Sequence, residues 1–420
     1  MSITAITNVT VIDGAGQRTE AATVVVDGER ITHVGKGPAP AGATVIDGTG
    51  CSVMPGLFNC HYHSSYRLVG STGLPIGMEG SPGFLTLRGA HNCALALNSG
   101  FTSVISAGTP HAVDASLKAA MDEGIMRGPR IMAGSRDVST TAHTQDKYFH
   151  WYWAPGQHPG VLVCDGPEEF RKGVRTEIKR GAEYIKVFAT PGHSVRGAYD
   201  QMEISPDELR AVIDAAHERG VKVRAHIANK KAIMMAVEYG LDAVDHGDGI
   251  DDECIALMAE RGTFLIPSCF FPFRSQHRRT GYHADVMRSE MLAMLAILPK
   301  AHAAGVKIVL GDDYGTLWLE HGEYGKELGF YVDESGISPA DAITWATRNG
   351  ADMMGMAGEL GDIRPGMLAD LLIVKGDPLV DINLLGDTDN VLVVMKNGEF
   401  EKNLMADQPV RVAIPQLVNA

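Results

Sequence analysis

The sequence predicts an α/β protein: a (β/α)8 TIM barrel joined to a small composite β-sandwich domain that both termini build. Apolar strand runs alternate with helical patterns over residues 55–358, and eight β–α steps can be counted there, as such a barrel requires. Both ends of the chain instead alternate apolar and polar positions between Gly and Asp turns, which is typical of strands joined by tight turns. A length of 420 residues suits one large barrel plus a minor domain.

Five segments of alternating polarity predict the composite domain. Three lie near the N-terminus, in "ITNVTVIDGAG", "AATVVVDGERITHVG" and "ATVIDGTG", and two near the C-terminus, in "ADLLIVKGDP" and "NVLVVMKNGEF". Two β-rich ends around a different middle indicate one domain built from both. We assign residues 1–54 and 359–405 to this domain, residues 55–358 to the barrel, and residues 406–420 to a C-terminal tail.

The barrel strands are predicted at Met54–Phe58, Ser103–Ala107, Arg130–Gly134, Tyr184–Ala189, Lys222–His226, Ala243–His246, Thr263–Pro267 and Lys307–Leu310. The helices between them carry start signals. Ser205 is expected to cap one helix and to form a capping box with Glu208, Gly220 should end it, and Ser338 repeats the N-cap pattern. A doubly wound open sheet is the alternative. No predicted strand, however, is followed by the Gly-rich fingerprint of dinucleotide-binding folds.

Composition restricts the partners and the compartment. The chain has 37 Lys and Arg against 51 Asp and Glu, a formal charge of -14, which argues against a nucleic acid or an anionic membrane as partner. A small-molecule substrate is expected instead. The six cysteines form no CxxC pair and are expected to be reduced, as in a cytoplasmic protein. Neither a signal peptide nor an apolar run long enough to cross a bilayer is recognisable.

Metal-competent residues stand at the carboxyl ends of several predicted strands. The first strand runs into His61 and His63, which share a face because side chains alternate along a strand. His226 ends the fifth strand, His246 ends the sixth, and Asp313 follows the eighth. One such histidine alone would more often be a hydrogen-bonded structural group. In a barrel these strand ends converge on one mouth, and four histidines with a carboxylate form a ligand set for zinc or a similar divalent ion.

A lysine interrupts the apolar strand of "GAEYIKVFAT". Its ammonium group would lose hydration among apolar neighbours, which is costly unless the charge is paired or removed. The ordinary interpretation is a lysine that extends from the strand edge to solvent. A buried Lys186 would instead need a specific partner.

At these motifs the chain resembles the amidohydrolase superfamily, and the resemblance covers nearly all of its length. "VIDGTGCSVMPGLFNCHYH" is similar to the superfamily's entry into the first barrel strand, and "GDIRPGMLADLLIVKGDP" to its return into the β-domain. "DGPEEFRKGVRTEIKRGAEYIKVFATPG" and "VKVRAHIANKKAIMMAVEYGLDAVDHG" are most similar to the binuclear branch. That branch contains imidazolonepropionase-like enzymes, Xaa-Pro and Xaa-Arg dipeptidases and ochratoxin-type amidases.

The resemblance implies a ligand set for two divalent ions, with zinc expected. His61, His63 and Asp313 would hold the more buried ion, and His226 and His246 the outer one. Lys186 would react with carbon dioxide, and the resulting carbamate would bridge both ions. Burial favours the neutral amine that this reaction needs. Relatives often form homo-oligomers, so the same is expected here.

Two positions depart from the superfamily pattern. Asn59 stands where an Asp usually precedes the first histidine by two residues, so the amide is expected to orient a ligand less strongly. Asp312 stands where a Thr usually precedes the catalytic Asp. A second carboxylate there would either raise the pKa of its neighbour or face solvent.

The resemblance also implies the chemistry, which is cleavage of an amide C–N bond in an N-acyl amino acid or a dipeptide-like substrate. A metal-bridged hydroxide would attack the carbonyl, with Asp313 as general base and then general acid. His143 would hydrogen-bond the substrate carbonyl, and His321 matches a further histidine of the superfamily. Trp151 and Trp153 are candidates for an apolar wall of the substrate pocket, although ordinary packing would also explain them.

Other functions remain open at the level of sequence. Hydrolysis of carbamates or substituted ureas such as phenylureas would use the same scaffold. A mononuclear deaminase would not need Lys186, and a non-catalytic relative would need none of the ligands.

Overall fold

The structure is a computed structural model that describes residues 3–69, 71, 74–143, 146, 152, 159–192 and 200–413. Trp151 and Trp153 lie outside these described residues.

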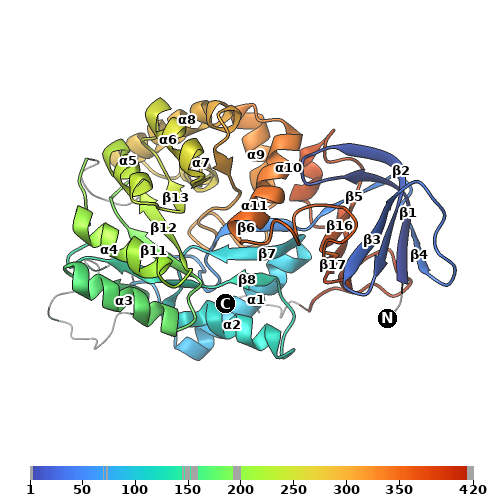
Figure 1. Cartoon of the computed structure of the whole chain (residues 1–420), viewed down its shortest axis with the longest axis horizontal. Coiled ribbons are helices and arrows are strands. Elements are labelled where there is room, and N and C mark those ends of the chain that lie inside the picture. Colours follow the sequence, from blue (N-terminus) through green and yellow to red (C-terminus); the bar gives the residue numbers. More distant parts are fainter. Residues whose placement is uncertain are drawn as a thin grey trace.

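Both ends of the chain meet in one sheet of eight strands. Its strands are β1 (Ile3–Ile12), β2 (Arg18–Asp27), β3 (Arg30–Gly35), β4 (Thr44–Asp47), β5 (Cys51–Pro55), β16 (Leu371–Lys375), β17 (Val391–Lys396) and β18 (Glu399–Asn403). The order is β18-β17-β16-β5-β1-β2-β3, with β4 beside β1. β16 runs antiparallel to β5, and this pairing joins the C-terminal strands to the N-terminal ones (Figure 1). The hydrogen bonds thus link all strands of the expected sandwich into a single sheet.

The middle of the chain forms two parallel sheets that carry the predicted barrel strands. The first contains β6 (Leu57–Tyr62), β7 (Phe101–Ser106) and β8 (Arg130–Met132). The second contains β9 (Gly134–Ser139), β10 (Val161–Val163), β11 (Tyr184–Phe188), β12 (Lys222–Ile227), β13 (Ala243–His246), β14 (Phe264–Ile266) and β15 (Lys307–Ile308). Among the described residues these ladders do not close into one continuous barrel. The chain nevertheless passes directly from β8 to β9, and the Cys60 amide donates to the Leu310 carbonyl at 2.7 Å beyond β15.

The first predicted strand has to be corrected. Met54 belongs to β5 of the composite sheet, where it pairs with Leu372, whereas Phe58 belongs to β6 and pairs with Ser103. Gly56 separates the two strands, and a Cβ there would lie 2.2 Å from the Thr102 hydroxyl oxygen. Because both strands are buried on both faces, no polar residue marks the transition in the sequence. The third predicted strand is likewise divided, into β8 and the longer β9.

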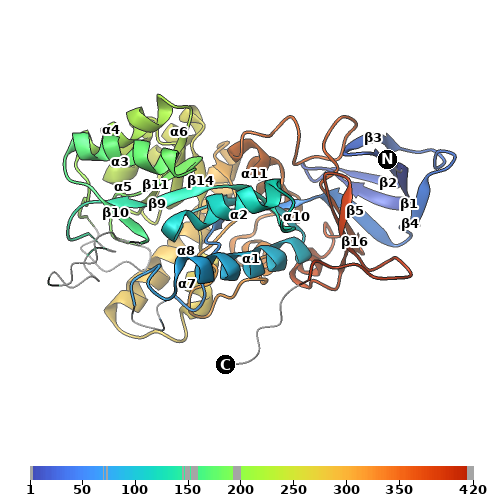
Figure 2. The ribbon, with the colours of Figure 1, turned by 90° about the horizontal axis from the view of Figure 1, so that it is seen from below.

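Helices surround the parallel sheets (Figures 1 and 2). They are α1 (Pro82–Asn98), α2 (Val113–Asp122), α3 (Pro167–Lys179), α4 (Pro206–His217), α5 (Lys230–Glu238), α6 (Asp252–Arg261), α7 (Phe270–Ser275), α8 (Tyr282–Ala303), α9 (Lys326–Ser335), α10 (Pro339–Ala346) and α11 (Arg348–Met353). The capping box of α4 is present, with Ser205 and Glu208 bonded to each other's backbone amides. Ser338 is the N-cap of α10, where its hydroxyl oxygen accepts the Asp341 amide. The expected helix starts are therefore confirmed, while α4 ends three residues before Gly220.

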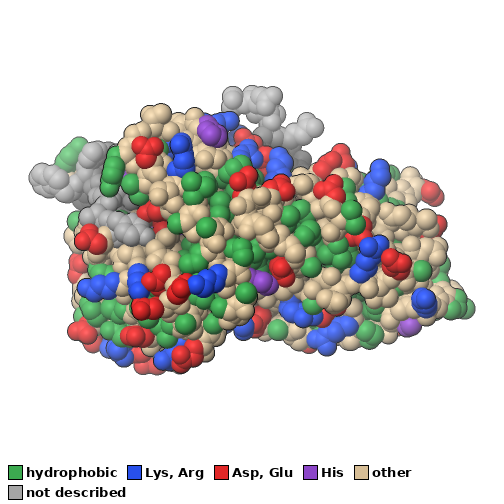
Figure 3. Space-filling view, turned by 90° about the horizontal axis from the view of Figure 1, so that it is seen from above, with side chains coloured by type: hydrophobic (Ala, Val, Ile, Leu, Met, Phe, Trp, Pro, Cys, Tyr) green, Lys and Arg blue, Asp and Glu red, His purple; other side chains and the backbone are tan. Residues whose placement is uncertain are grey.

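All six cysteines are buried and free of disulfides. On the face seen in Figure 3, acidic and basic side chains are interspersed rather than gathered by sign. No helix within the described part of the chain combines the length and the apolar character needed to span a membrane.

Candidate active site

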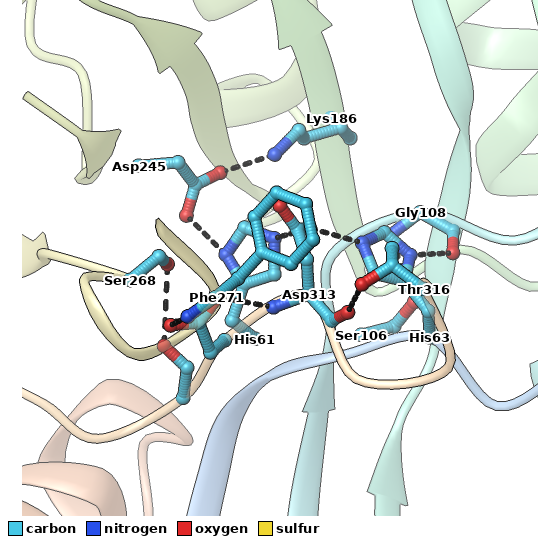
Figure 4. Close-up of polar contacts among 12 residues, drawn as sticks. His61, His63, Ser106, Gly108, Lys186, Asp245, Ser268, Phe271, Asp313 and Thr316 are labelled. Carbon is cyan, nitrogen blue, oxygen red and sulfur yellow. Dashed lines mark hydrogen bonds and ion pairs between the residues drawn. The ribbon is translucent and has the colours of Figure 1, made fainter. Parts of the chain in front are cut away.

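Two histidines and an aspartate form a compact group at the carboxyl end of β6. His61 lies within β6, His63 follows one residue after its end, and Asp313 lies in the loop after β15. Asp313 Oδ1 is 3.1 Å from His61 Nε2 and 3.3 Å from His63 Nε2 (Figure 4). One donor atom from each residue lies within 4.8 Å of the others. Two imidazole nitrogens and a carboxylate at this spacing suit a divalent ion such as zinc.

Protein contacts also hold the Nδ1 side of the His61 and His63 rings in place. His63 Nδ1 is 2.9 Å from the Gly108 carbonyl oxygen, and its ring stacks on Tyr66 with centroids 4.0 Å apart. His61 Nδ1 is 3.2 Å from Asp245 Oδ1. These contacts on the outer nitrogens leave both Nε2 atoms directed at Asp313, as in histidines that bind metals in other proteins. The donor set therefore fits a metal ion.

Electrostatics keeps Asp313 ionised. Burial opposes ionisation, but the contacts with His61 and His63 outweigh it and hold the pKa of Asp313 well below its usual value. The turn before Asp313 also packs closely on β6. A Cβ at Gly311 would lie 2.3 Å from the His61 amide nitrogen, and its φ of +151° is one that L-residues rarely adopt. The sequence Gly-Asp-Asp therefore places the ionised Asp313 carboxylate directly against β6.

Two more histidines extend the group. His226 lies near the end of β12 and His246 at the end of β13, with ring centroids 4.6 Å apart. The His246 ring is also 5.2 Å from that of His61. Phe188 stacks on His226 at 4.5 Å and fixes its plane. The four predicted histidine ligands thus adjoin one another, although only His61 and His63 lie in the compact group with Asp313.

Lys186 is buried and its ammonium group has a specific partner. The side chain is 3% exposed, and Nζ donates to Asp245 Oδ2 at 2.6 Å. Asp245 also accepts from Arg224, whose Nε lies 3.0 Å from Oδ2 and whose Nη2 contacts Oδ1. Figure 4 shows Asp245 bonded to both Lys186 and His61. Lys186 is therefore not a surface lysine, and it points toward the group formed by the histidines.

Asp245 and Arg224 were not predicted from the sequence. Arg224 could have been found, because it precedes His226 by two residues and so shares its face of β12. Asp245 could not, because neighbouring residues of a strand normally face opposite sides. His246 has a φ of +70°, in the left-handed region that non-glycine residues seldom adopt, and this turn allows both Asp245 and His246 to face the site. Strained residues of this kind often cluster at functional sites.

The two departures from the superfamily pattern have defined contacts. Asn59 Oδ1 accepts the His61 amide at 3.1 Å. Asp312 is fully buried and accepts the amides of Phe270, Phe271 and Asp313 at 2.7, 3.0 and 2.7 Å. The expectation that Asp312 faces solvent or raises the pKa of Asp313 was wrong, because these amides bind its carboxylate. Burial, followed by the charge of Asp312, instead raises the pKa of Glu327 in α9.

His143 and His321 occupy different surroundings. His143 is buried, contacts the Glu203 carboxylate through Nε2, and lies edge-on to the Phe188 ring at 5.5 Å. His321 Nδ1 is 2.7 Å from the Tyr324 hydroxyl. Burial lowers the pKa of His321 to about 3, so this imidazole is neutral. Contact of either histidine with a substrate stays a prediction.

Comparison with known proteins identifies the family. Residues 52–400 match the sequence pattern of the amidohydrolase family. Ochratoxinase from Aspergillus niger is 28% identical over 378 residues, which cover 83% of this chain and 75% of that protein. Its crystal structure superposes with a TM-score of 0.84 at 25% identity and covers 99% of both chains.

Two further crystal structures resemble this chain. A Xaa-Pro dipeptidase with methionine bound in its active site has a TM-score of 0.83 at 29% identity, covering 95% of this chain and 99% of that one. Phenylurea hydrolase B has a TM-score of 0.77 at 23% identity, covering 99% of this chain and 100% of that one, and this likeness concerns the fold alone. The structural neighbours imply a TIM barrel with an added β-rich domain. The chain is a hydrolytic enzyme that acts on carbon–nitrogen bonds, and it belongs to the amidohydrolase family.

Proposed function

We propose that the enzyme hydrolyses the amide bond of an N-acyl amino acid or a dipeptide-like substrate at a centre of two divalent ions, with zinc expected. The burial of Lys186 beside the histidine group carries this proposal. A mononuclear centre would have no use for a lysine at that position. Retention of all six candidate ligands also argues against a non-catalytic relative.

The residues divide into two ligand groups and a bridge. His61, His63 and Asp313 would hold the more buried ion, and His226 and His246 the outer one. Lys186, carboxylated on Nζ, would contact both. The chemistry supplied by a bound metal pair is activation of water near neutral pH and polarisation of a carbonyl group.

The chain's own side chains would manage the proton and the developing charge. Asp313 is ionised at neutral pH, so its carboxylate would accept a proton from the attacking water and pass it to the leaving nitrogen. His143, in contact with Glu203, would donate a hydrogen bond to the carbonyl oxygen as negative charge develops there.

The substrate class rests on two of the similar structures described above. Both the Xaa-Pro dipeptidase and ochratoxinase match almost the whole chain in structure, and the first is named for cleavage of a dipeptide. Carbamates and substituted ureas are the second candidate, since phenylurea hydrolase B shares the fold. A hydrolysis screen of zinc-loaded enzyme against acyl amino acids, dipeptides, carbamates and phenylureas tests the assignment. Turnover of ureas or carbamates alone would overturn the amide proposal.

Substitution of Lys186 tests the two-metal centre. Lys186→Ala should reduce bound metal from two ions per chain to one and lower kcat/KM at least about 100-fold, because catalytic groups that act together contribute several kcal/mol. Metal content by elemental analysis and steady-state kinetics provide the measurement. Lys222→Ala is the matched control. Lys222 lies at the end of β12 away from His226, and its Nζ donates to the Met353 carbonyl at 2.7 Å. A Lys186→Ala enzyme with two ions and full activity would exclude the bridging role.

A further inference from the structure

A third carboxylate lies in the interior beside the candidate ligands. Asp137 belongs to β9 and is 5% exposed. Its backbone amide donates to the Gly160 carbonyl at 3.0 Å. Within the described part of the chain, its carboxylate makes no hydrogen bond or ion pair. An ionised carboxylate without a partner is costly to bury, so its position calls for an explanation.

The strand register fixes the direction of this side chain. β9 and β11 are parallel, and Asp137 is the direct partner of Lys186. Partners on adjacent parallel strands project to the same face of a sheet. Since Lys186 Nζ reaches Asp245 within the interior, the Asp137 carboxylate faces the same space.

The contacts of Gly108 locate the carboxylate relative to the compact histidine group. A Cβ at Gly108 would lie 2.6 Å from Asp137 Oδ1 and 3.7 Å from His63 Cε1. The absence of a side chain at Gly108 therefore leaves room for the carboxylate next to the His63 ring. The same glycine fixes His63 through its carbonyl oxygen. Asp137 thus lies between the lysine of β11 and the imidazole that follows β6.

The nearby charges point to a cation as the missing partner. The Asp137 carboxylate interacts electrostatically with four nearby groups, those of Lys186, Asp313, His61 and Asp245. The lysine ammonium already donates to Asp245, which Arg224 also binds. Conversion of Lys186 to a carbamate would add one more anion beside Asp137. A divalent ion is the remaining partner that would satisfy both the Asp137 carboxylate and the carbamate, because buried anions are costly without a cation.

We propose that Asp137 is a further ligand residue of the metal centre and contributes a carboxylate oxygen to it from β9. This inference rests on the proposed metal centre. It adds a second carboxylate, beside that of Asp313, to the ligand set.

Metal titration of substituted enzymes tests the proposal. Metal-free enzyme is titrated with Zn²⁺ and with Co²⁺, and affinity, stoichiometry and the Co²⁺ absorption spectrum are recorded. Asp137→Asn should weaken the tighter site at least about 10-fold, as loss of a supporting group does in metal sites, and should alter the Co²⁺ spectrum because a ligand changes. Asp114→Asn is the control, since Asp114 is also buried but its Oδ1 already accepts from the Ser64 hydroxyl.

Stability without metal separates a ligand from a structural residue. Metal-free Asp137→Asn should unfold at the same urea concentration as metal-free wild type or higher, because it loses an unpartnered buried charge. Weaker metal binding without loss of metal-free stability supports the proposal. Wild-type affinity and an unchanged Co²⁺ spectrum in Asp137→Asn would overturn it, as would loss of activity only toward cationic substrates with metal binding intact. If wild type itself binds no metal, the proposed function fails as well.

Discussion

At the scale of single residues, Asp245 connects the parts of the candidate site. It accepts from Lys186, Arg224 and His61, which come from three different strands. Burial opposes ionisation of Asp245, but Arg224 above all holds its pKa well below the usual value. Since Arg224 is always charged, Asp245 remains an anion whether or not Lys186 is modified. A carbamate nitrogen retains one N–H, so Asp245 can orient Lys186 before and after carboxylation.

Removal of the Asp245 charge should therefore cost stability. Asp245→Asn leaves the fully buried Arg224 guanidinium without its counter-ion, and breaking a buried pair in this way costs about 3–5 kcal/mol. Urea unfolding measures the change in free energy. The double variant Arg224→Met, Asp245→Asn should recover part of the loss, because the guanidinium is then no longer buried without its counter-ion. An Asp245→Asn enzyme as stable as wild type would contradict this interpretation.

A substitution at Gly311 tests how closely the loop that carries Asp313 must approach β6. In Gly311→Ala the new Cβ would meet the His61 amide nitrogen, so the loop carrying Asp313 has to move away. We expect a loss of metal affinity and of kcat/KM of at least about 10-fold, in line with effects of a 1 Å misplacement. Gly305→Ala is the control, because Gly305 also has a positive φ of +89° but no atom within 4 Å of the added Cβ. Equal metal affinity in the two variants would argue against a positioning role for the close approach.

At the scale of elements, the sequence predicts the strands and caps better than their junctions. The strand-end histidines and the Ser205 capping box follow from local residue patterns, and the structure contains both. The division between β5 and β6 could not be predicted, because an apolar run buried on both faces has no period that marks its sheet. The inward turn of Asp245 was equally hidden, since it depends on the positive φ of His246.

An ion pair between two elements gives a pH-dependent contribution to stability. His217 at the end of α4 lies 2.8 Å from the Asp242 carboxylate, just before β13. This hydrogen bond raises the pKa of His217 above its ordinary value of 6.5. A raised histidine pKa means that the folded state binds the proton more tightly, so the stabilisation is complete below pH 6.5 and disappears as the pH rises through the folded value.

Substitution of His217 should therefore matter at low pH only. The imidazole side chain is 41% exposed, so solvent screening limits the expected loss in His217→Gln to about 0.3–1 kcal/mol near pH 5.5. Near pH 9 the variant and wild type should be equally stable. Urea unfolding at both pH values provides the comparison. A deficit that is the same at both would mean that packing rather than charge connects α4 to this position.

At the scale of the whole molecule, the candidate ligands join elements that the hydrogen-bond ladders leave separate. His61 and His63 extend from the sheet of β6 to β8, whereas Lys186, His226 and His246 belong to the sheet of β9 to β15. Asp313 follows the last strand of that second sheet. A metal centre at this point would tie the two parallel sheets together. The composite sheet is attached to the same region, because β5 continues through Gly56 into β6.

Metal removal should consequently lower the stability of the whole barrel rather than of one loop. Binding to the native state alone adds RT ln(1 + [L]/Kd), about 2.7 kcal/mol at a free metal concentration of 100 Kd. Differential scanning calorimetry with zinc and after chelation should show one cooperative transition that moves to lower temperature when metal is removed. For His61→Ala, we expect the Tm to be nearly the same with and without chelator, because the ion no longer joins β6 to Asp313. If wild type has the same Tm with and without bound metal, the ion does not connect the two sheets, and the histidine group must be held by the fold alone.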